Sequence, residues 1–578
     1  MPTDDTIRRH LMNRMEVRFE RLYGHDAARE CTARLRLLLS IYEDIGERNG
    51  NGNRWNQATN VLITYGDMVQ NADDVPLQTL HRFLKDKLSD VIHTVHILPF
   101  CPYSSDDGFS VIDYRAVDTD LGAWDDVEAI GEDFELMFDL VLNHCSKRSS
   151  WFRNFVAGVD PAAGYFHDVD PEIDVSMVTR PRPWPLLTKV MTRAGERHVW
   201  TTFSEDQVDL NFANPDVMLE FLDILMFYVA RGARIVRLDA IAYLWKQIGT
   251  TCIHLDETHE VVKVMRDLLQ LVAPQVLLLT ETNVPHEENI SYFGDGDEAH
   301  VVYNFSLPPL LLHALQTGSA RYVTRWAQSM DSPPRNCTFL NFTASHDGIG
   351  VRPLEGIIPI EERDKFVKTM RSLGGFVNEK TNEDGTRSPY ELNITYFDAM
   401  GTPGAPDDET KVKRFLCSQT IAMSVKGIPA VYFHSLVAAP NDLEGVTKQG
   451  HNRAINRHKW NDDHLRSLLD DNASTNARVF DEYRRRLSVR SSQPAFHPDA
   501  RQRVLSLLDE VFAVERLEAE SGQSILCLFN LTGNDVVVSG SRVLLLIQAG
   551  CTDMLGNKIK LVDGSLKLSP YESLWLTS

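Results

Sequence analysis

The chain has 578 residues, enough for one large domain with appendages, and its 81 acidic residues exceed its 59 basic residues by 22. This surplus of negative charge repels nucleic acids and anionic membranes, so it excludes a function built on a basic groove. The eight cysteines are scattered without metal-ligand spacing, and neither a secretory signal nor a membrane-spanning run is found. We therefore expect a soluble cytoplasmic protein with reduced thiols and no nucleic-acid or membrane partner.

The first segment, residues 1–55, is predicted to be an N-terminal helical extension. Apolar residues such as Leu35, Leu38 and Ile45 recur among charged residues at helical spacing. The glycine- and asparagine-rich residues 50–53 end this pattern.

Beyond this break, strand-like apolar runs alternate with helical segments. We predict eight strands at residues 61–65, 91–98, 136–142, 235–238, 276–280, 300–305, 338–342 and 430–433. Eight apolar strands separated mainly by helices are typical of an α/β fold, the parallel (β/α)8 or TIM barrel, whose active site lies at the carboxyl ends of the strands. We assign residues 56–143 and 210–503 to this barrel.

Two connections are too long for single helices. Residues 144–209, rich in proline and aromatic residues, follow the third predicted strand, and residues 350–396 follow the seventh. Long excursions at the catalytic face of a barrel act as lids or specificity walls, so we interpret both as inserted lid domains. Disorder is the alternative for the second insertion, which carries a polar run at residues 378–388.

The last segment, residues 504–578, changes from a helical pattern to short strands separated by turn residues. The predicted strands include residues 511–514, 525–529 and 543–547. We therefore expect a C-terminal antiparallel β-domain.

The fourth predicted strand ends in Arg237-x-Asp239, which places two opposite charges at the end of a buried apolar run. A neighbouring guanidinium favours the ionised form of a carboxyl group and lowers its pKa. An ionised Asp239 is a candidate nucleophile. A purely structural ion pair explains the same two residues equally well.

Polar residues also follow other predicted strands: His144 the third, Glu281 the fifth, and His346 with Asp347 the seventh. Taken singly, each has a purely structural explanation: His144 as a core histidine, Glu281 as a neighbour of a helix N-cap, and Asp347 as a turn residue. Together they indicate glycosidic chemistry, which needs one carboxylate as nucleophile and one carboxylic acid of raised pKa as proton donor. We assign Asp239 as nucleophile and Glu281, which has no adjacent cation in the sequence, as proton donor. Asp347 is then expected to bind sugar hydroxyls.

These residues carry a family resemblance. Asp139-x-Val141-x-Asn143-His144, Arg237-x-Asp239, Glu281 and His346-Asp347 resemble, in this order, the four signature regions of the α-amylase family of retaining α-glucoside enzymes. The resemblance implies a barrel with an inserted lid and a C-terminal β-domain. It also implies that Asp239 is the nucleophile, Glu281 the acid/base and Asp347 the stabiliser of the transition state. His144, Arg237 and His346 would bind the sugar.

A narrower resemblance is to the sucrose phosphorylase group, through residues 105–114, 180–183, 249–252, 307–314 and 455–458. It implies that Asp106 and Arg457 hold the far edge of one glucosyl ring and that Phe109 forms an apolar platform; we add Tyr243 to this substrate-binding set.

The same resemblance implies that phosphate, rather than water, resolves a covalent glucosyl-enzyme. Arg182 matches the position of the cation that an incoming phosphate dianion requires, and a guanidinium can bind phosphate bidentately. Without the resemblance, a solvated proline-rich loop explains Arg182.

The chain differs from sucrose phosphorylases at the acceptor subsite. Asn283 stands where that group has histidine, and Tyr390-Glu391 stands where it has Tyr-Gln. The N-terminal helical extension is also foreign to that group. This extension followed by residues 61–65, together with residues 280–286 and 387–393, resembles most the phosphorylases of 2-O-α-D-glucosyl-D-glycerate. An anionic acceptor suits Arg182, whereas Glu391 argues against it unless its side chain turns outward or contacts glycerate hydroxyls.

We therefore predict a retaining glucosyl phosphorylase, a hexosyltransferase that reversibly converts 2-O-α-D-glucosyl-D-glycerate and phosphate to α-D-glucose 1-phosphate and D-glycerate by double displacement. Phosphate is a co-substrate, and the reaction needs no metal or organic cofactor. Asp and Glu are plentiful enough to bind a structural Ca²⁺, but no oxygen-ligand loop stands out. A homodimer is left open. The alternatives are phosphorylases of sucrose, sucrose 6-phosphate or glucosylglycerol, then a hydrolase, and, from another class, a non-catalytic sugar-binding or scaffold protein.

Overall fold

The computed structural model describes residues 4–42, 54–182, 184–381, 386–405 and 408–577. Its centre is a closed barrel in which every neighbouring pair of strands is parallel, in the spatial order β1, β16, β12, β11, β10, β9, β4, β3. The strands are β1 (Val61–Thr64), β3 (Thr94–Ile97), β4 (Glu135–Val141), β9 (Ala233–Asp239), β10 (Leu277–Thr280), β11 (Val301–Tyr303), β12 (Thr338–Asn341) and β16 (Ile428–Tyr432). Each coincides with one of the eight predicted strands, and the predicted (β/α)8 barrel is confirmed.

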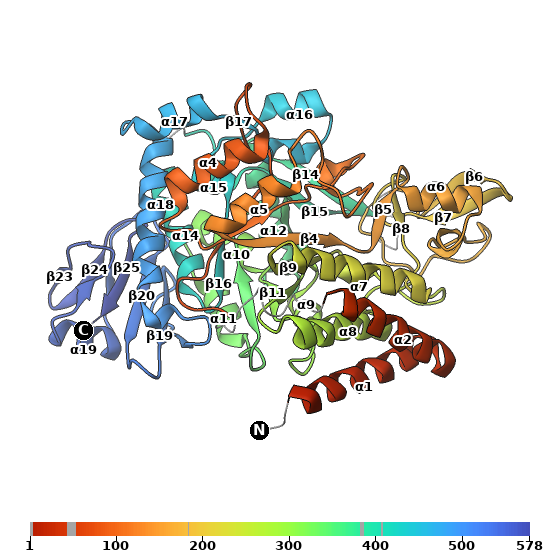
Figure 1. Cartoon of the computed structure of the whole chain (residues 1–578). Helices are drawn as coiled ribbons and strands as arrows, with labels where there is room; N and C mark the ends of the chain where they lie inside the picture. The colour runs from red at the N-terminus through yellow and green to blue at the C-terminus, as the bar shows by residue number, and fades with distance from the viewer. Residues whose placement is uncertain (1–3, 43–53, 183, 382–385, 406–407, 578) are drawn as a thin grey trace.

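Helices surround the barrel (Figure 1). Those that follow barrel strands are α4 (Pro76–Leu88), α5 (Trp124–Asp133), α7 (Pro215–Ala230), α8 (Asp256–Val272), α9 (His286–Ile290), α10 (Leu307–Thr317), α11 (Arg321–Ser329), α14 (Asp408–Ser424), α15 (Phe433–Leu436), α16 (Leu443–Gln449), α17 (Asp462–Asp470) and α18 (Thr475–Ser491). In α4, Pro76 begins the helix, and Leu77, Leu80 and Leu84 form the buried stripe that packs on the barrel. None of the described helices is long and apolar enough to cross a membrane.

The N-terminal segment forms two helices, α1 (Asp4–Tyr23) and α2 (His25–Ile41), which lie along α7 and α8 on the outside of the barrel (Figure 1). Gly24, with φ 80°, separates them, a break that the helical pattern did not reveal. Charge pairs attach α1 to α8: Arg18 Nε lies 2.9 Å from Oδ2 of the buried Asp267, and Arg14 Nε lies 2.8 Å from the same oxygen. The predicted break at residues 50–53 lies outside the described residues.

The segment after β4 contains β5 (His144–Ser146), α6 (Ser150–Ala157), the hairpin of β6 (Leu187–Thr192) and β7 (Gly195–Trp200), and β8 (Gln207–Asp209). The segment after β12 contains β13 (Ile349–Gly350), α12 (Ile360–Ser372), β14 (Phe376–Thr381), β15 (Arg387–Asn393) and α13 (Tyr396–Ala399). Strands β13, β15 and β14 form a three-stranded antiparallel sheet beside the barrel mouth. Residues 382–385 of the polar run expected here lie outside the described residues.

The C-terminal region is antiparallel, as predicted. One sheet has the order β18 (Arg501–Val504), β19 (Val511–Leu517), β20 (Ser524–Asn530), β25 (Ser573–Thr577) and β22 (Thr552–Asp553), and a second has the order β21 (Val536–Val538), β24 (Ser565–Leu568) and β23 (Lys560–Val562). Trp575 Nε1 donates a hydrogen bond to Ser424 Oγ on α14 at 2.8 Å, which joins the first sheet to the barrel.

The strand predicted at residues 543–547 is wrong: these residues belong to helix α19 (Ser541–Gln548). Val543 and Leu546 are buried, whereas Leu544 and Leu545 are exposed. This spacing of three is helical. A five-residue apolar run is too short for its composition alone to separate a helix from a strand.

Candidate active site

The fourth barrel strand places two of the predicted residues in the barrel interior. Arg237 and Asp239 are two residues apart on β9, so their side chains point to the same face. Arg237 Nη1 lies 2.7 Å from Asp239 Oδ1 and also contacts Asp139 Oδ1 on the neighbouring strand β4. His96 on β3 binds the other oxygen of Asp139 at 2.6 Å. Arg237 therefore forms ion pairs with two carboxylates, those of Asp139 and Asp239.

This sharing changes the ionisation that we expected for Asp239. Burial raises the pKa of Asp239 well above its usual value, and Arg237 lowers it too little to compensate. Burial likewise tends to raise the pKa of Asp139, but His96 and Arg237 together hold it at about 2. The expectation that Arg237 keeps the pKa of Asp239 low is therefore wrong, because burial and the neighbouring carboxylates Glu281, Asp139 and Asp347 outweigh the arginine.

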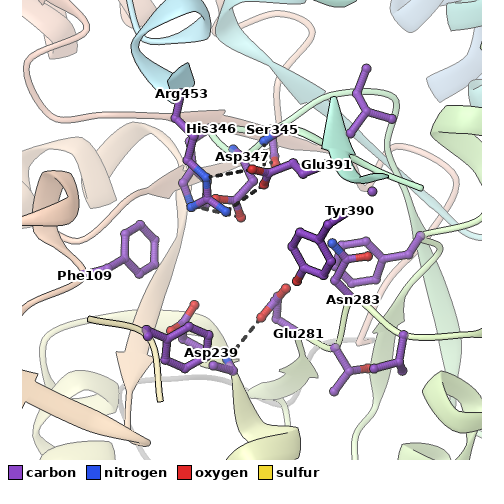
Figure 2. Close-up of a pocket in the computed structure, with 18 of the residues that line it drawn as sticks. Phe109, Asp239, Glu281, Asn283, Ser345, His346, Asp347, Tyr390, Glu391 and Arg453 are labelled. Atoms are coloured by element: carbon purple, nitrogen blue, oxygen red, sulfur yellow. Dashed lines mark hydrogen bonds and ion pairs between the residues drawn. The ribbon is translucent and has the colours of Figure 1, made fainter. Parts of the chain in front are cut away.

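Glu281 follows β10 and lies beside the end of β9. Its Oε2 accepts a hydrogen bond from the backbone N–H of Ala240 at 3.1 Å, directly after Asp239. Burial raises the pKa of Glu281 above its usual value, although Arg237, 3.9 Å away, opposes this shift. Both carboxyls face one pocket (Figure 2). Besides burial, the charge of Glu281 raises the pKa of Asp239 and the charge of Asp347 raises the pKa of Glu281, so the pair binds a proton more readily than isolated carboxyls do.

Asp347 lies on the opposite side of this pocket, beside Arg453 (Figure 2). Arg453 Nη1 lies 2.5 Å from Asp347 Oδ1, and Arg457 Nη2 lies 3.8 Å from the same oxygen. Burial alone would raise the pKa of Asp347, but Arg453, His346 and Arg457 hold it well below its usual value. Asp347 is therefore the permanently ionised member of the three carboxylates.

The remaining residues expected at the glucosyl ring lie around Asp347 and Asp239. The ring of Phe109 stacks on that of His346, with centroids 4.7 Å apart. His144 Nε2 lies 2.9 Å from the carbonyl oxygen of Phe109, and Tyr243 lines the same pocket. Asp106 has φ 53°, a left-handed conformation that is unfavourable for a residue with a side chain. Such strain is typical of functional loops.

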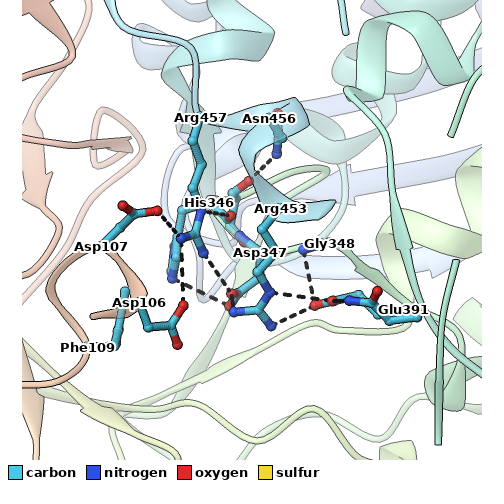
Figure 3. Close-up of polar contacts among 12 residues, drawn as sticks. Asp106, Asp107, Phe109, His346, Asp347, Gly348, Glu391, Arg453, Asn456 and Arg457 are labelled. Carbon is cyan, nitrogen blue, oxygen red and sulfur yellow. Dashed lines mark hydrogen bonds and ion pairs between the residues drawn. The ribbon is translucent and has the colours of Figure 1, made fainter. Parts of the chain in front are cut away.

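Arg457 holds this strained loop to the barrel (Figure 3). Its Nη1 lies 2.5 Å from Asp107 Oδ2 but 3.7 Å from Asp106 Oδ1, and its Nε donates to the carbonyl oxygen of His346 at 2.9 Å. Asp107 is thus the direct partner of Arg457, which leaves Asp106 oriented toward the pocket. The sequence motif did not distinguish these adjacent aspartates.

The four residues predicted for phosphate and the acceptor also line the pocket: Arg182, Asn283, Tyr390 and Glu391. Among the described residues, the half-buried Arg182 guanidinium has no hydrogen-bond or ion-pair partner, and the buried Asn283 Oδ1 has none either. Glu391 differs, because both of its oxygens are bonded to neighbouring residues. Of the predicted site residues, all but Arg237 and Arg457 line the pocket, and those two contact residues that do.

Two residues that support the site were missed. Arg453 lies four residues before Arg457, the spacing of one helical turn, and this was the available signal. Lys246 is buried behind the pocket wall: its Nζ lies 2.7 Å from Asp209 Oδ2 and 2.8 Å from Asn143 Oδ1. No local pattern predicts Lys246, because its partners come from two other segments. In the described part of the chain, no group of three or more His, Cys, Asp or Glu is placed to hold a metal ion.

A parallel barrel with three carboxylates at the carboxyl ends of its strands defines the class: a carbohydrate-active (β/α)8 enzyme. Residues 89–348 match the family described as alpha amylase, catalytic domain. The chain is 46% identical over 526 residues to the glucosylglycerate phosphorylase of Spirochaeta thermophila, and the alignment covers 89% of both chains. It is 43% identical over 524 residues to the glucosylglycerate phosphorylase of Escherichia coli, covering 90% of this chain and 92% of the other. The crystal structure of sucrose 6F-phosphate phosphorylase from Thermoanaerobacter thermosaccharolyticum matches with a TM-score of 0.71 and 26% identity, over 82% of this chain and 94% of that one. The chain belongs to the α-amylase family, within the group of the glucosylglycerate phosphorylases.

Proposed function

We propose that the enzyme reversibly converts 2-O-α-D-glucosyl-D-glycerate and phosphate to α-D-glucose 1-phosphate and D-glycerate. The observation that carries this proposal is the 46% identity to a glucosylglycerate phosphorylase across 89% of both chains. The pocket supplies the chemistry: an acidic pair, a third carboxylate that stays ionised, and the unpartnered cation Arg182 at the same cavity.

In the first half of the reaction, Asp239 attacks the anomeric carbon and Glu281 protonates the departing O2 of glycerate. The raised pKa of Glu281 suits a proton donor at neutral pH, and the mechanism requires the form of the pair in which Asp239 is ionised and Glu281 carries the proton. Asp347 binds sugar hydroxyls, an interaction that strengthens as positive charge develops on the ring. The product is a covalent β-glucosyl ester of Asp239.

In the second half, an oxygen of phosphate attacks the anomeric carbon of this ester, the bond from that carbon to Asp239 breaks, and Asp239 leaves as a carboxylate. Glu281 receives the proton released by the incoming phosphate, and the α configuration is restored. Phosphate and glycerate are both anions that enter a carboxylate-rich pocket. Arg182 is the group suited to both, because a guanidinium binds phosphate or carboxylate bidentately. We assign Asn283 and Tyr390 to the acceptor hydroxyls, and Asp106, Phe109, His144 and Tyr243 to the glucosyl ring.

An acceptor screen in the synthetic direction tests this function. Purified enzyme receives α-D-glucose 1-phosphate with D-glycerate, glycerol, fructose or fructose 6-phosphate, and phosphate release is followed. We expect fast release with D-glycerate alone. Release with fructose, fructose 6-phosphate or glycerol would move the assignment to a phosphorylase of sucrose, sucrose 6-phosphate or glucosylglycerol, and release without any acceptor would indicate a hydrolase.

We also propose that the enzyme acts in the cytoplasm. All eight cysteines lie in the described part of the chain, and all are free thiols, seven of them buried. Proteins of oxidising compartments use such residues in disulfides, whereas cytoplasmic proteins keep them reduced. Thiol titration of the denatured protein, purified without reductant, is expected to give eight thiols per chain, and a value of six or fewer would contradict this location.

A further inference from the structure

Glu391 occupies an unexpected place in the acceptor half of the pocket. Four donors surround its carboxylate. Oε1 accepts from the Gly348 backbone N–H at 3.2 Å and from Arg453 Nη2 at 2.7 Å, and Oε2 accepts from Asn378 Nδ2 at 2.9 Å and from Arg453 Nε at 3.4 Å. The residue is 1% exposed. A carboxylate so fully bonded has little capacity left for an acceptor hydroxyl.

The partner of Glu391 connects it to the catalytic side of the pocket. The Arg453 guanidinium uses two nitrogens for Glu391 and its third, Nη1, for Asp347 Oδ1 at 2.5 Å (Figure 3). Arg453 therefore bridges two carboxylates: it makes a bidentate contact with Glu391 and a single contact with Asp347. Burial tends to raise the pKa of Glu391, but Arg453 and Arg182 hold it below its usual value, so Glu391 is ionised at neutral pH.

We propose that Glu391 is a positioning residue: it competes with Asp347 for Arg453 and thereby keeps the carboxylate of Asp347 free for the glucosyl hydroxyls. A guanidinium prefers a planar, bidentate contact with a carboxylate. With Glu391 ionised, Arg453 makes that contact on the lid strand β15 and only a single contact with Asp347. Without this charge, Arg453 turns to a bidentate pair with Asp347 and covers the oxygens that the sugar needs.

The backbone supports the same role. A Cβ atom at Gly348 would lie 2.4 Å from Glu391 Cγ, so only glycine allows this approach directly after Asp347. Gly350 on β13 pairs with Glu391 on β15 in the lid sheet. The chain that carries Asp347 is therefore attached to Glu391 at two points directly after Asp347, through the Gly348 N–H and through the pairing of Gly350.

Glu391→Gln is the direct test, because glutamine keeps the size of the side chain and removes its charge. This inference rests on the proposed glucosyl-enzyme but not on glycerate, so the substrate is α-D-glucosyl fluoride, in which fluoride replaces glycerate as the leaving group. Fluoride release is measured at saturating phosphate, which resolves the glucosyl-enzyme. We expect kcat/KM for the fluoride to fall about 10- to 100-fold, the loss that a displaced catalytic group produces. KM for D-glycerate in the synthetic direction is expected to change less than threefold.

A double-mutant cycle separates competition from loss of structure. In Glu391→Gln/Arg453→Met, Arg453 can no longer cover Asp347, and Arg457, at 3.8 Å, remains engaged with Asp107, so we expect kcat/KM for the fluoride to recover at least fivefold relative to Glu391→Gln alone. Glu391→Asp keeps the charge and is expected to retain more activity than Glu391→Gln. If Glu391→Gln does not fold, Arg453→Lys serves instead, because an ammonium cannot divide itself between two carboxylates in this manner and the same loss is expected.

Three outcomes overturn the proposal. Fluoride kcat/KM within twofold of wild type, together with a raised KM for D-glycerate, makes Glu391 an acceptor contact. Additive losses in the double variant remove the competition. Arg453→Lys with unchanged activity does the same. Inactivity of the wild-type enzyme on the fluoride would instead contradict the proposed function itself, so the two failures are distinguishable.

Discussion

The two halves of the pocket differ in how their charges are balanced. In the glucosyl half, Arg237 binds Asp139 and Asp239, and Arg457 binds Asp107. In the half proposed for the acceptor, the Arg182 guanidinium forms no hydrogen bond and no ion pair within 4.0 Å with a described residue, although its charge lowers the pKa of Glu391. A ring of fixed shape is best bound by groups that neighbouring charges already hold in place, whereas a subsite that exchanges two anions needs a cation that is available to each.

The largest expected effect is the loss of the nucleophile in the glucosyl half. Asp239→Ala removes the atom that forms the covalent bond, so kcat/KM for phosphorolysis should fall on the order of 10⁴-fold or more. Phosphate consumption measures this loss. The matched control is Asp256→Ala at the exposed start of α8, which should keep wild-type activity. Activity of Asp239→Ala above 1% of wild type would contradict the assignment.

The second prediction concerns the support behind the glucosyl half. Lys246→Met leaves the fully buried Asp209 without its ammonium partner, and breaking a buried ion pair from one side costs about 3–5 kcal/mol in the free energy of unfolding. Urea denaturation measures the loss. Lys147→Met is the control: Lys147 pairs with Glu205 at 3.5 Å on the surface, and its loss should cost less than about 1 kcal/mol. Equal losses in the free energy of unfolding for the two variants would show that the buried ion pair stabilises the fold no more than the surface pair does.

The third prediction addresses the acceptor half. Arg182→Ala removes the available cation, and because hydrogen bonds to charged groups contribute about 1.5–3 kcal/mol, KM for phosphate should rise about tenfold or more. The kcat/KM for α-D-glucosyl fluoride should change little, because it reports the formation of the glucosyl-enzyme, a step that needs no phosphate. The control is Arg193→Ala, an exposed arginine at the turn between β6 and β7. An unchanged KM for phosphate would refute the role of Arg182.

The pH dependence of kcat/KM sharpens the account of the glucosyl half. In the proposed mechanism the active form has Asp239 ionised and Glu281 protonated, so activity is expected to fall at low pH as Asp239 takes a proton and at high pH as Glu281 loses one. Burial raises both pKa values, so the bell-shaped profile should lie above the range of 3.8 to 4.5 that holds for the free acids. Asp139→Asn should leave Arg237 to Asp239 alone and move the acid limb down by about one pH unit. An unmoved acid limb would show that the sharing of Arg237 does not control Asp239.

Sequence reasoning reached the fold and most of the pocket for a common reason. In a parallel barrel, the residue after each strand faces the catalytic side, so strand ends such as those carrying Asp239 and Glu281 can be located from local patterns. The missed features depend on partners distant in the chain. Arg453 lies 62 residues from Glu391, and Lys246 lies 103 residues from Asn143. The prediction of a low pKa for Asp239 was wrong for a similar reason, because the shift depends in part on Asp139, which lies on another strand.

The smallest expected effect concerns Asn283, where the chain differs from sucrose phosphorylases. Its Oδ1 lies 2.4 Å from where a Cβ atom of Gly350 would be, so the lid strand leaves little room for a larger ring. Asn283→His should therefore raise KM for D-glycerate about three- to tenfold, the effect of one lost neutral hydrogen bond plus crowding. Asn283→Ala, which removes the amide without crowding, should give the smaller rise. Neither variant should cleave sucrose efficiently, because Arg182 and the lid remain as they are. Efficient sucrose phosphorolysis by Asn283→His would show that a single side chain, rather than the available cation, separates the two acceptor halves.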